Sequence, residues 1–350
     1  MIEIDGSMGE GGGQIVRSSL ALAAVTGQKL RLRNIRRGRS KPGLLRQHLA
    51  GVRAISQICP GTVGGSSVEG AELGSTELVF TPSPPRGGDY TFEVGSAGSA
   101  VLVAQTILPA LLIADAPSDV TIGGGTHAAW APPFDFFERC YLPLLARMGV
   151  RALTEIQSHG FYPAGGGKIS LTIHPVQKWR GQQINERHGT LQPRVLALAA
   201  RVPESVAERE CDVIRRKTDW EPSAFETQEV VRSGGPGNVV MIECGFDNVR
   251  ELFIGFGKKG VKAERVARGV LADARKYLSS HVPVGSYLAD QLLLPMGMAA
   301  ANGCHSEFVT SELTPHSKTH IEVLQQFLDI QIRTDVRKDG TTHVSLQGSG

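Results

Sequence analysis

Three stretches of the chain share one pattern of small, hydrophobic and polar positions. Each follows a glycine-containing turn, opens near a glutamine (Gln14, Gln105 or Gln291) and continues as an alanine- and leucine-rich run. The last two stretches also share a Q-x-x-L-P motif. Runs in which apolar residues recur at helical spacing predict helices that pack on a hydrophobic core.

A second helix and several strands accompany each of these stretches. Amphipathic patterns predict the second helices at residues 42–58, 133–148 and 316–327. Short strand-like runs predict strands at residues 78–81, 90–94, 120–122 and 168–173. We therefore predict an α+β fold in which a unit of two helices and several strands occurs three times, with the helices on one face of each sheet.

The third unit is separated from the second by a stretch of different character. It combines strands at residues 195–200, 239–244 and 252–256 with helices at residues 205–217 and 262–278. We interpret residues 185–279 as a small αβ domain inserted into a parent domain made of residues 1–184 and 280–350. The polar segment at residues 181–189 suits an insertion, because exposed turns tolerate inserted domains.

Composition narrows the class of protein. Of the 350 residues, 41% are hydrophobic and 20% are charged, as in ordinary globular proteins. No apolar run reaches transmembrane length and the first residues do not resemble a signal peptide, so we expect a cytoplasmic protein without a membrane partner. The five cysteines are scattered and never form C-x-x-C, which argues against a disulfide framework and a zinc site.

Charge is distributed unevenly along the chain. Residues 11–68 contain ten Lys and Arg and no Asp or Glu, although the whole chain has a net charge of only +3. The run RRGRSKPG in this segment favours an extended loop that follows phosphates, whereas the alternative is a solvated basic face without a partner. No helix-turn-helix or zinc-finger pattern predicts sequence-specific base recognition.

A glycine-rich loop opens the chain. Residues 5–17, DGSMGEGGGQIVR, follow a short apolar run and precede the first predicted helix, so backbone N–H groups there can face an anion. Glu10 lies inside this loop and would repel a phosphate unless a divalent cation lay between them. The loop has neither the G-K-[ST] ending of a P-loop nor the G-x-G-x-x-G spacing, and the alternative is a tight turn that needs positive φ.

Two further motifs carry side chains suited to nucleotide chemistry. In TPHSKTH, His316 follows a proline at a predicted helix start, where a neutral imidazole can act as a nucleophile toward phosphorus. His320 lies one turn further on, as a partner, a competitor or a surface residue. In YLADQ, Tyr287 can stack on a flat ring while Asp290 and Gln291 form hydrogen bonds; the alternative is a half-exposed tyrosine and an acidic cap.

An apolar wall is predicted near residues 123–137. Pro133 and Phe136 would present rigid surface to a nucleobase, although these prolines are equally suited to starting a helix. For Phe134 and Phe137 we expect burial in the core.

With these motifs, the chain closely resembles the RNA 3′-terminal phosphate cyclase family. The matching segments are GEGGGQIVR at residues 9–17, RRGRSKPGLLRQH at 36–48, GSAGSAVLVAQTILPAL at 95–111, HGFYPAGGG at 159–167, YLADQLLLPM at 287–296 and PHSKTHIEVLQQF at 315–327. The resemblance implies three repeats of a two-helix, four-stranded-sheet unit, like the C-terminal domain of a translation initiation factor. It also implies an insert of thioredoxin-like topology without redox function.

The resemblance further implies that the protein uses ATP to convert an RNA 3′-phosphate into a 2′,3′-cyclic phosphodiester. His316 corresponds to the family's adenylylated nucleophile. The implied nucleotide-binding residues are Pro133, Phe136, Gln105, Tyr287, Leu288, Ala289, Asp290 and Gln291, with Glu10 and Gln14 near the phosphates and Glu10 near a divalent cation, Mg²⁺ or Mn²⁺. Arg17, Arg39 and Arg46 are implied to contact pyrophosphate or the RNA end.

Two alternatives use related scaffolds. Some members of the wider family lack the nucleophilic histidine and act in ribosome biogenesis without catalysis; His316 favours the active branch. An enolpyruvyl-type transferase is disfavoured because the histidine and YLADQ motifs have no role there. The sequence does not define an oligomeric state.

Overall fold

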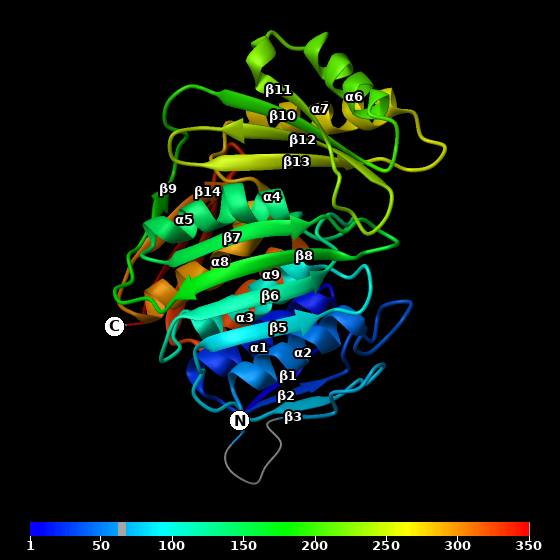
Figure 1. The fold of residues 1–350 in the computed structure, drawn as a ribbon. Coiled ribbons are helices and arrows are strands. Elements are labelled where there is room, and N and C mark those ends of the chain that lie inside the picture. Colours follow the sequence, from blue (N-terminus) through cyan, green and yellow to red (C-terminus); the bar gives the residue numbers. More distant parts are fainter. Residues whose placement is uncertain (62–67, 350) are drawn as a thin grey trace.

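The computed structural model describes residues 1–61 and 68–349 and has a mixed α+β fold, as predicted (Figure 1). Four sheets of four strands are present in this part of the chain. The first sheet has the strand order β1 (Ile2–Asp5), β2 (Leu30–Arg33), β4 (Leu78–Phe80), β3 (Val68–Glu69). The second has the order β5 (Gly88–Glu93), β6 (Ser118–Gly124), β8 (Gly167–His174), β7 (Arg151–Ser158). The third has the order β9 (Gln183–Ile184), β14 (Ser306–Thr310), β16 (Thr342–Gly348), β15 (Ile330–Val336). The end of the acid-free segment, residues 62–67, lies outside the described residues.

These three sheets share one strand order. In each, the first two strands in the chain are parallel, and the fourth strand pairs antiparallel with both the second and the third. Two helical segments accompany each sheet: α1 (Gly13–Thr26) and α2 (Arg46–Ile58); α3 (Ala100–Leu111) and the segment α4 (Phe134–Phe136) to α5 (Leu142–Arg147); and α8 (Ser286–Ala301) and α9 (Pro315–Phe327).

The predicted helix at residues 133–148 is interrupted. Between α4 and α5 the backbone forms a π-helical turn at Phe137–Tyr141, so the prediction of one regular helix is corrected. Pro143 gives the physical reason, because it has no N–H to donate to the carbonyl four residues earlier, and a wider turn accommodates that gap.

The fourth sheet, at residues 192–256, has a different strand order. It consists of β11 (Phe225–Glu229), β10 (Gln192–Ala200), β12 (Gly237–Gly245) and β13 (Arg250–Phe256), and is accompanied by α6 (Ser205–Arg215) and α7 (Ala263–Ser280). Along β10 the side chains alternate between two cores, because successive residues of a strand point to opposite faces. Val195 and Ala197 pack with α6 and α7, while Leu196 and Leu198 join the main core of the molecule.

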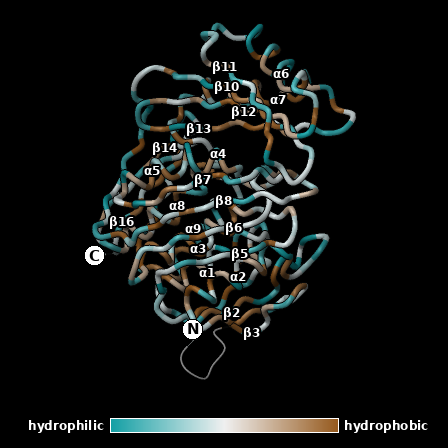
Figure 2. The backbone as a smooth tube through the Cα atoms, in the orientation of Figure 1, coloured by the Kyte–Doolittle hydropathy of each residue, from teal (hydrophilic) through white to brown (hydrophobic). Residues whose placement is uncertain are grey.

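The hydrophobic pattern of the sequence is visible in space. Figure 2 shows hydrophobic residues along the inner helices and strands and hydrophilic residues on the outer loops. Within the described part of the chain, no helix is long and apolar enough to cross a membrane.

Glu251 joins β13 to the start of α8. Its buried carboxylate accepts a hydrogen bond from the backbone N–H of Gly285, the residue before α8, at 2.5 Å. Burial raises the pKa of Glu251 to about 8, while the Gly285 N–H and the nearby Arg187 act in the opposite direction. At neutral pH the folded protein therefore holds a proton that the unfolded chain releases.

We expect Glu251→Gln to raise the free energy of unfolding by an amount that grows between about pH 5 and pH 8. Protonated Glu251 contributes its full stability below the unfolded pKa, and that contribution is lost as the pH rises through about 8. The side-chain oxygen of glutamine can still accept the hydrogen bond from the Gly285 N–H, and glutamine never ionises. The free energy of unfolding of the variant therefore does not fall by up to a few kcal/mol as the pH rises. Urea unfolding at several pH values measures the difference. Glu186→Gln, at an exposed carboxylate, is the control, and a pH-independent difference for Glu251→Gln would contradict the assignment.

Candidate active site

Helices from the two ends of the chain meet at the predicted nucleophile. α9 packs against both α1 and α8. Thr314 caps the start of α9: its Oγ1 accepts a hydrogen bond from the Ser317 N–H at 3.0 Å, and Pro315 occupies the first helical position. His316 therefore lies in the first turn of a helix, as the sequence predicted, where backbone N–H groups and the helix dipole favour an anion.

Both ring nitrogens of His316 have partners. Nε2 lies 2.6 Å from Oε2 of Glu10, and Nδ1 lies 2.9 Å from Oε1 of Gln14. The Gln14 oxygen can only accept, so Nδ1 carries a proton and donates it to this hydrogen bond. A carboxylate oxygen of Glu10 is likewise an acceptor, so any proton on Nε2 would be shared with Glu10. Transfer of that proton would leave a lone pair on Nε2, which is the requirement for a nucleophile.

Asp290 fixes the orientation of the Gln14 amide. The Gln14 Nε2 donates to Oδ1 of Asp290 at 2.6 Å, which directs the amide oxygen toward His316. Burial by itself would raise the pKa of Asp290, but hydrogen bonds with His320 and Gln14 and the nearby His316 outweigh it, so the pKa is lowered. Asp290 is therefore an anion at neutral pH.

His320 is a buried partner in the same network rather than a surface residue. Its Nδ1 lies 3.1 Å from the backbone oxygen of Asp290 and 3.2 Å from Nε2 of Gln14, and its Nε2 lies 3.1 Å from Oγ of Ser18. Ser18 was not predicted as a site residue. The signal was available, because Ser18 follows Gln14 by four positions, on the same face of α1.

The family resemblance implies that an AMP adduct forms on His316; we expect His320→Ala to slow its formation about tenfold while His320→Asn retains most of the rate. Alanine leaves buried polar groups of Gln14 and Asp290 without a partner, which costs about 1–3 kcal/mol. Asparagine can place an amide donor near the position of Nδ1. Initial rates of adduct formation at several ATP concentrations give the maximal rate and KM separately. A rise in KM alone, with an unchanged maximal rate, would show that His320 does not position the nucleophile.

A small polar cavity of about 40 Å³ adjoins this network. Gln14, Arg17, Ser18, Gln105, Gln291 and His320 contribute its polar lining. Gln105 donates to Oε1 of Gln291 at 2.8 Å, and Gln291 donates to Oδ2 of Asp290 at 3.2 Å, so one chain of hydrogen bonds links α3 to α8. Its volume suits a water molecule rather than a nucleotide.

Arg17 is the charged member of the cavity lining. Burial lowers the pKa of its guanidinium to about 10, with Asp290 acting in the opposite direction, so Arg17 is still a cation at neutral pH. Within residues 1–61 and 68–349 its side chain makes no hydrogen bond or ion pair. A phosphate oxygen would supply the missing partner, because guanidinium and phosphate match in geometry.

The other predicted arginines occupy two different places. Arg39 donates to Oε1 of Glu10 at 2.8 Å and to the backbone oxygen of Glu10 at 3.0 Å, so it is next to His316. Arg46 instead donates to the backbone oxygen of Gly95 at 3.0 Å and is not in contact with this network. Arg36 donates to the backbone oxygens of Lys41 and Gly43 and so holds its own loop together.

The predicted nucleobase residues differ in accessibility. Tyr287, in the first turn of α8, is 78% exposed, whereas Pro133, the residue before α4, is buried. Phe136 is only 4% exposed and packs in the main core, as do Leu288 and Ala289. The side chains of Leu288 and Ala289 are therefore not accessible to a nucleotide.

The glycines of the first loop allow close packing. Gly9 and Gly11 have positive φ, as the tight-turn alternative required, and a side chain at Gly9 would collide with Thr319. A side chain at Gly13 would collide with the His48 ring. The loop is thus both a tight turn and the segment that holds Glu10 against His316.

A divalent cation would find few protein ligands here. Within the described residues, no group of three or more His, Cys, Asp or Glu side chains is placed to hold a metal ion. Glu10 is the carboxylate next to His316, so a cation at this position would take its other ligands from phosphate oxygens and water. That arrangement is normal for Mg²⁺, which often binds through one or two carboxylates and substrate phosphates.

Comparison with known proteins identifies the family. Residues 8–334 match the sequence model of a class of ligase-type RNA-processing proteins, described as RNA 3′-terminal phosphate cyclase. The chain therefore belongs to the RNA 3′-terminal phosphate cyclase family. The crystal structure of the enolpyruvyl transferase NikO from Streptomyces tendae is also similar, with 10% identity and a TM-score of 0.37. That match covers 98% of this chain, which spans about half (48%) of the NikO chain, and at this level it carries no argument.

Proposed function

We propose that the protein uses ATP to convert an RNA 3′-terminal phosphate into a 2′,3′-cyclic phosphodiester. The observation that carries this proposal is the His316 imidazole, held through both nitrogens by Glu10 and Gln14 in the first turn of α9. Membership of the family supplies the class of substrate, an RNA end.

The reaction has three steps. Nε2 of His316 attacks the α-phosphorus of ATP, so that an N–P bond forms, the bond to the bridging oxygen breaks, and pyrophosphate leaves. An oxygen of the RNA 3′-phosphate then attacks the same phosphorus, which frees His316 and gives an RNA-diphosphate-adenosine end. Finally the adjacent 2′-OH attacks the 3′-phosphorus and AMP leaves; proximity supplies much of the rate of this intramolecular step.

The residues around His316 support the proposed reaction in different ways. Glu10 accepts the Nε2 proton, and Gln14 keeps the other proton on Nδ1, so that the lone pair faces the substrate. Arg17 and the N-terminal turn of α9 stabilise phosphate charge. Arg39 lies close enough to act with them, whereas Arg46 is a candidate only for a more distant part of the RNA end.

The nucleotide and a cation complete the proposal. Tyr287 on one side and the Pro133/Phe136 wall on the other would sandwich adenine, while Asp290, Gln291 and Gln105 would hold the nucleotide. Glu10 would hold Mg²⁺ or Mn²⁺ together with phosphate oxygens; such a cation would offset phosphate charge.

We also propose that the three sheets of equal strand order are repeats of one unit and that residues 185–279 are an insert between β9 and α8. The shared order and the separate core of the fourth sheet support this division.

We propose that the protein is located in the cytoplasm. All five cysteines are free thiols, which reducing compartments favour.

Incubation of the protein with α-labelled ATP and magnesium tests the proposal. We expect an acid-labile, alkali-stable covalent AMP adduct, and release of AMP when RNA with a 3′-phosphate is added. The RNA end should become resistant to phosphatase. RNA binding by folded protein without an adduct or a resistant end would instead support the alternative, a non-catalytic RNA- or ribosome-biogenesis protein.

A further inference from the structure

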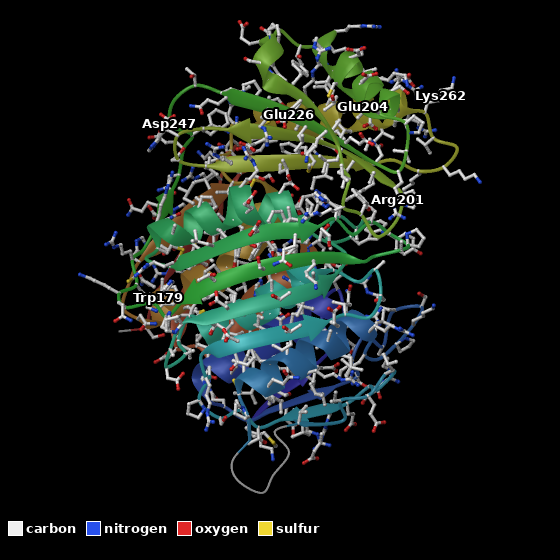
Figure 3. The ribbon with its side chains drawn as sticks, in the orientation of Figure 1. Trp179, Arg201, Glu204, Glu226, Asp247 and Lys262 are labelled. Carbon is white, nitrogen blue, oxygen red and sulfur yellow. The ribbon has the colours of Figure 1, made fainter. Side chains whose placement is uncertain are left out.

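A basic groove of about 660 Å³ runs along α7 and past the end of α6. Four of its lining side chains are cationic and none is acidic: Lys217, Arg268, Arg275 and Lys276. Glu204 and Lys262, which precede α6 and α7, lie in the upper part of Figure 3, whereas α1 and α9 lie lower in the same view (Figure 1). The groove is therefore separate from the His316 site.

The cations are arranged in a row. Arg268, Arg275 and Lys276 are seven and eight positions apart on α7, so they share one face of the helix. At about 1.5 Å per residue they extend over about 12 Å, and Lys217 continues the row from the end of α6. Ala272, between Arg268 and Arg275, is small and leaves the helix surface accessible. A row of this kind matches a repeating anion better than a single one.

Three of these four cations have no partner among the residues that the structure describes. In the part of the chain that the structure describes, the side chains of Lys217, Arg268 and Lys276 make no ion pair or hydrogen bond. Arg275 donates to the backbone oxygen of Lys217, which ties α7 to the end of α6.

Two cations near the groove are instead paired with carboxylates. Arg209 pairs with Glu264 at 3.4 Å and Arg215 pairs with Asp212 at 2.6 Å. Without a carboxylate partner, Lys217, Arg268 and Lys276 keep their attraction for a polyanion.

We propose that this groove binds the sugar–phosphate backbone of the substrate RNA upstream of its 3′-phosphate end. The inference rests on the proposed function, because it takes the RNA end to lie at His316. Its concave shape favours a strand over a flat membrane surface. Contacts with phosphates alone carry no sequence information, so the groove would add affinity for long RNA of any sequence.

The test compares Arg268→Glu/Lys276→Glu with a control of equal charge, Lys258→Glu/Lys259→Glu, in the exposed loop before α7. Binding is measured by fluorescence anisotropy with RNAs of about 6 and about 30 nucleotides, each with either a 3′-phosphate or a 3′-hydroxyl. We expect the groove variant to bind the long RNAs roughly tenfold more weakly and to lower the salt slope by about 1.4, the loss of two single-strand phosphate contacts. Binding of the short RNA and self-adenylylation should not change.

Three outcomes would overturn the proposal. The first is unchanged binding of long RNA by a folded groove variant, judged by thermal unfolding, and the second is an equal loss in the control. The third is a groove variant that loses binding to phosphatidylserine vesicles or to polyglutamate but still binds RNA. That result would assign the groove to a membrane or to an acidic protein. Groove-dependent RNA binding by a wild-type protein that forms no AMP adduct would reject the proposed reaction and leave the groove assignment intact.

Discussion

Replacing His316 by alanine is expected to abolish the covalent AMP adduct, with a fall in its rate of formation of at least about a thousandfold. The reason is chemical: the nitrogen that we propose forms the bond to phosphorus is removed, and His320, the neighbouring imidazole, is buried with both nitrogens engaged. Quantifying acid-labile label on the denatured protein measures the effect.

His320→Ala is the matched control for this experiment. It removes the second imidazole of the same helix, and we expect the adduct still to form, at the reduced rate given above. Label retained in His316→Ala and absent from His320→Ala would assign the nucleophile to His320 and overturn the mechanism. Binding of ATP to both variants, measured by equilibrium dialysis, separates loss of chemistry from loss of the nucleotide.

The second large effect is expected at Glu10. Glu10→Gln should slow self-adenylylation by about 10²–10⁴-fold, because an amide can contact Nε2 of His316 and Arg39 but cannot accept the proton that the proposed reaction moves from Nε2. The rate of adduct formation at saturating ATP measures this effect, and the magnesium dependence should move to higher concentrations if Glu10 also holds the cation.

Glu307→Gln, a carboxylate near two histidines in the third sheet, provides the matched control and should leave the rate unchanged. A Glu10→Gln rate within a few fold of wild type would show that the contact between Glu10 and His316 has no part in the chemistry.

Local structure could be predicted from the sequence wherever one helix or strand contains its own signal. The helix predicted at residues 262–278 is confirmed as α7 (Ala263–Ser280), and the helix at residues 316–327 as α9 (Pro315–Phe327). Pairing between distant strands has no such signal. β9 is only two residues long, and its partner β14 lies 124 positions further along the chain, between Gln183 and Glu307.

In the candidate site, too, local features could be predicted from the sequence, whereas contacts between distant segments could not. TPHSKTH predicts a histidine at a helix start, because proline and a capping threonine act locally. The sequence did not show that Gln14 would direct its oxygen at His316, since that orientation depends on Asp290 from a third helix. Nor could helical periodicity distinguish Phe136 from the two phenylalanines beside it, and all three are buried.

The wide separation of β9 and β14 has a consequence for biosynthesis. At about 5–20 residues per second, the ribosome needs roughly 6–25 s to make the 124 positions between these strands. During that interval the first two sheets can form, whereas the third sheet and α9 do not yet exist. Glu10 and Gln14 are thus synthesised early, before His316, their hydrogen-bond partner, exists. We expect a nascent chain halted before residue 315 to be compact, resistant to protease in its first half, and unable to react with ATP.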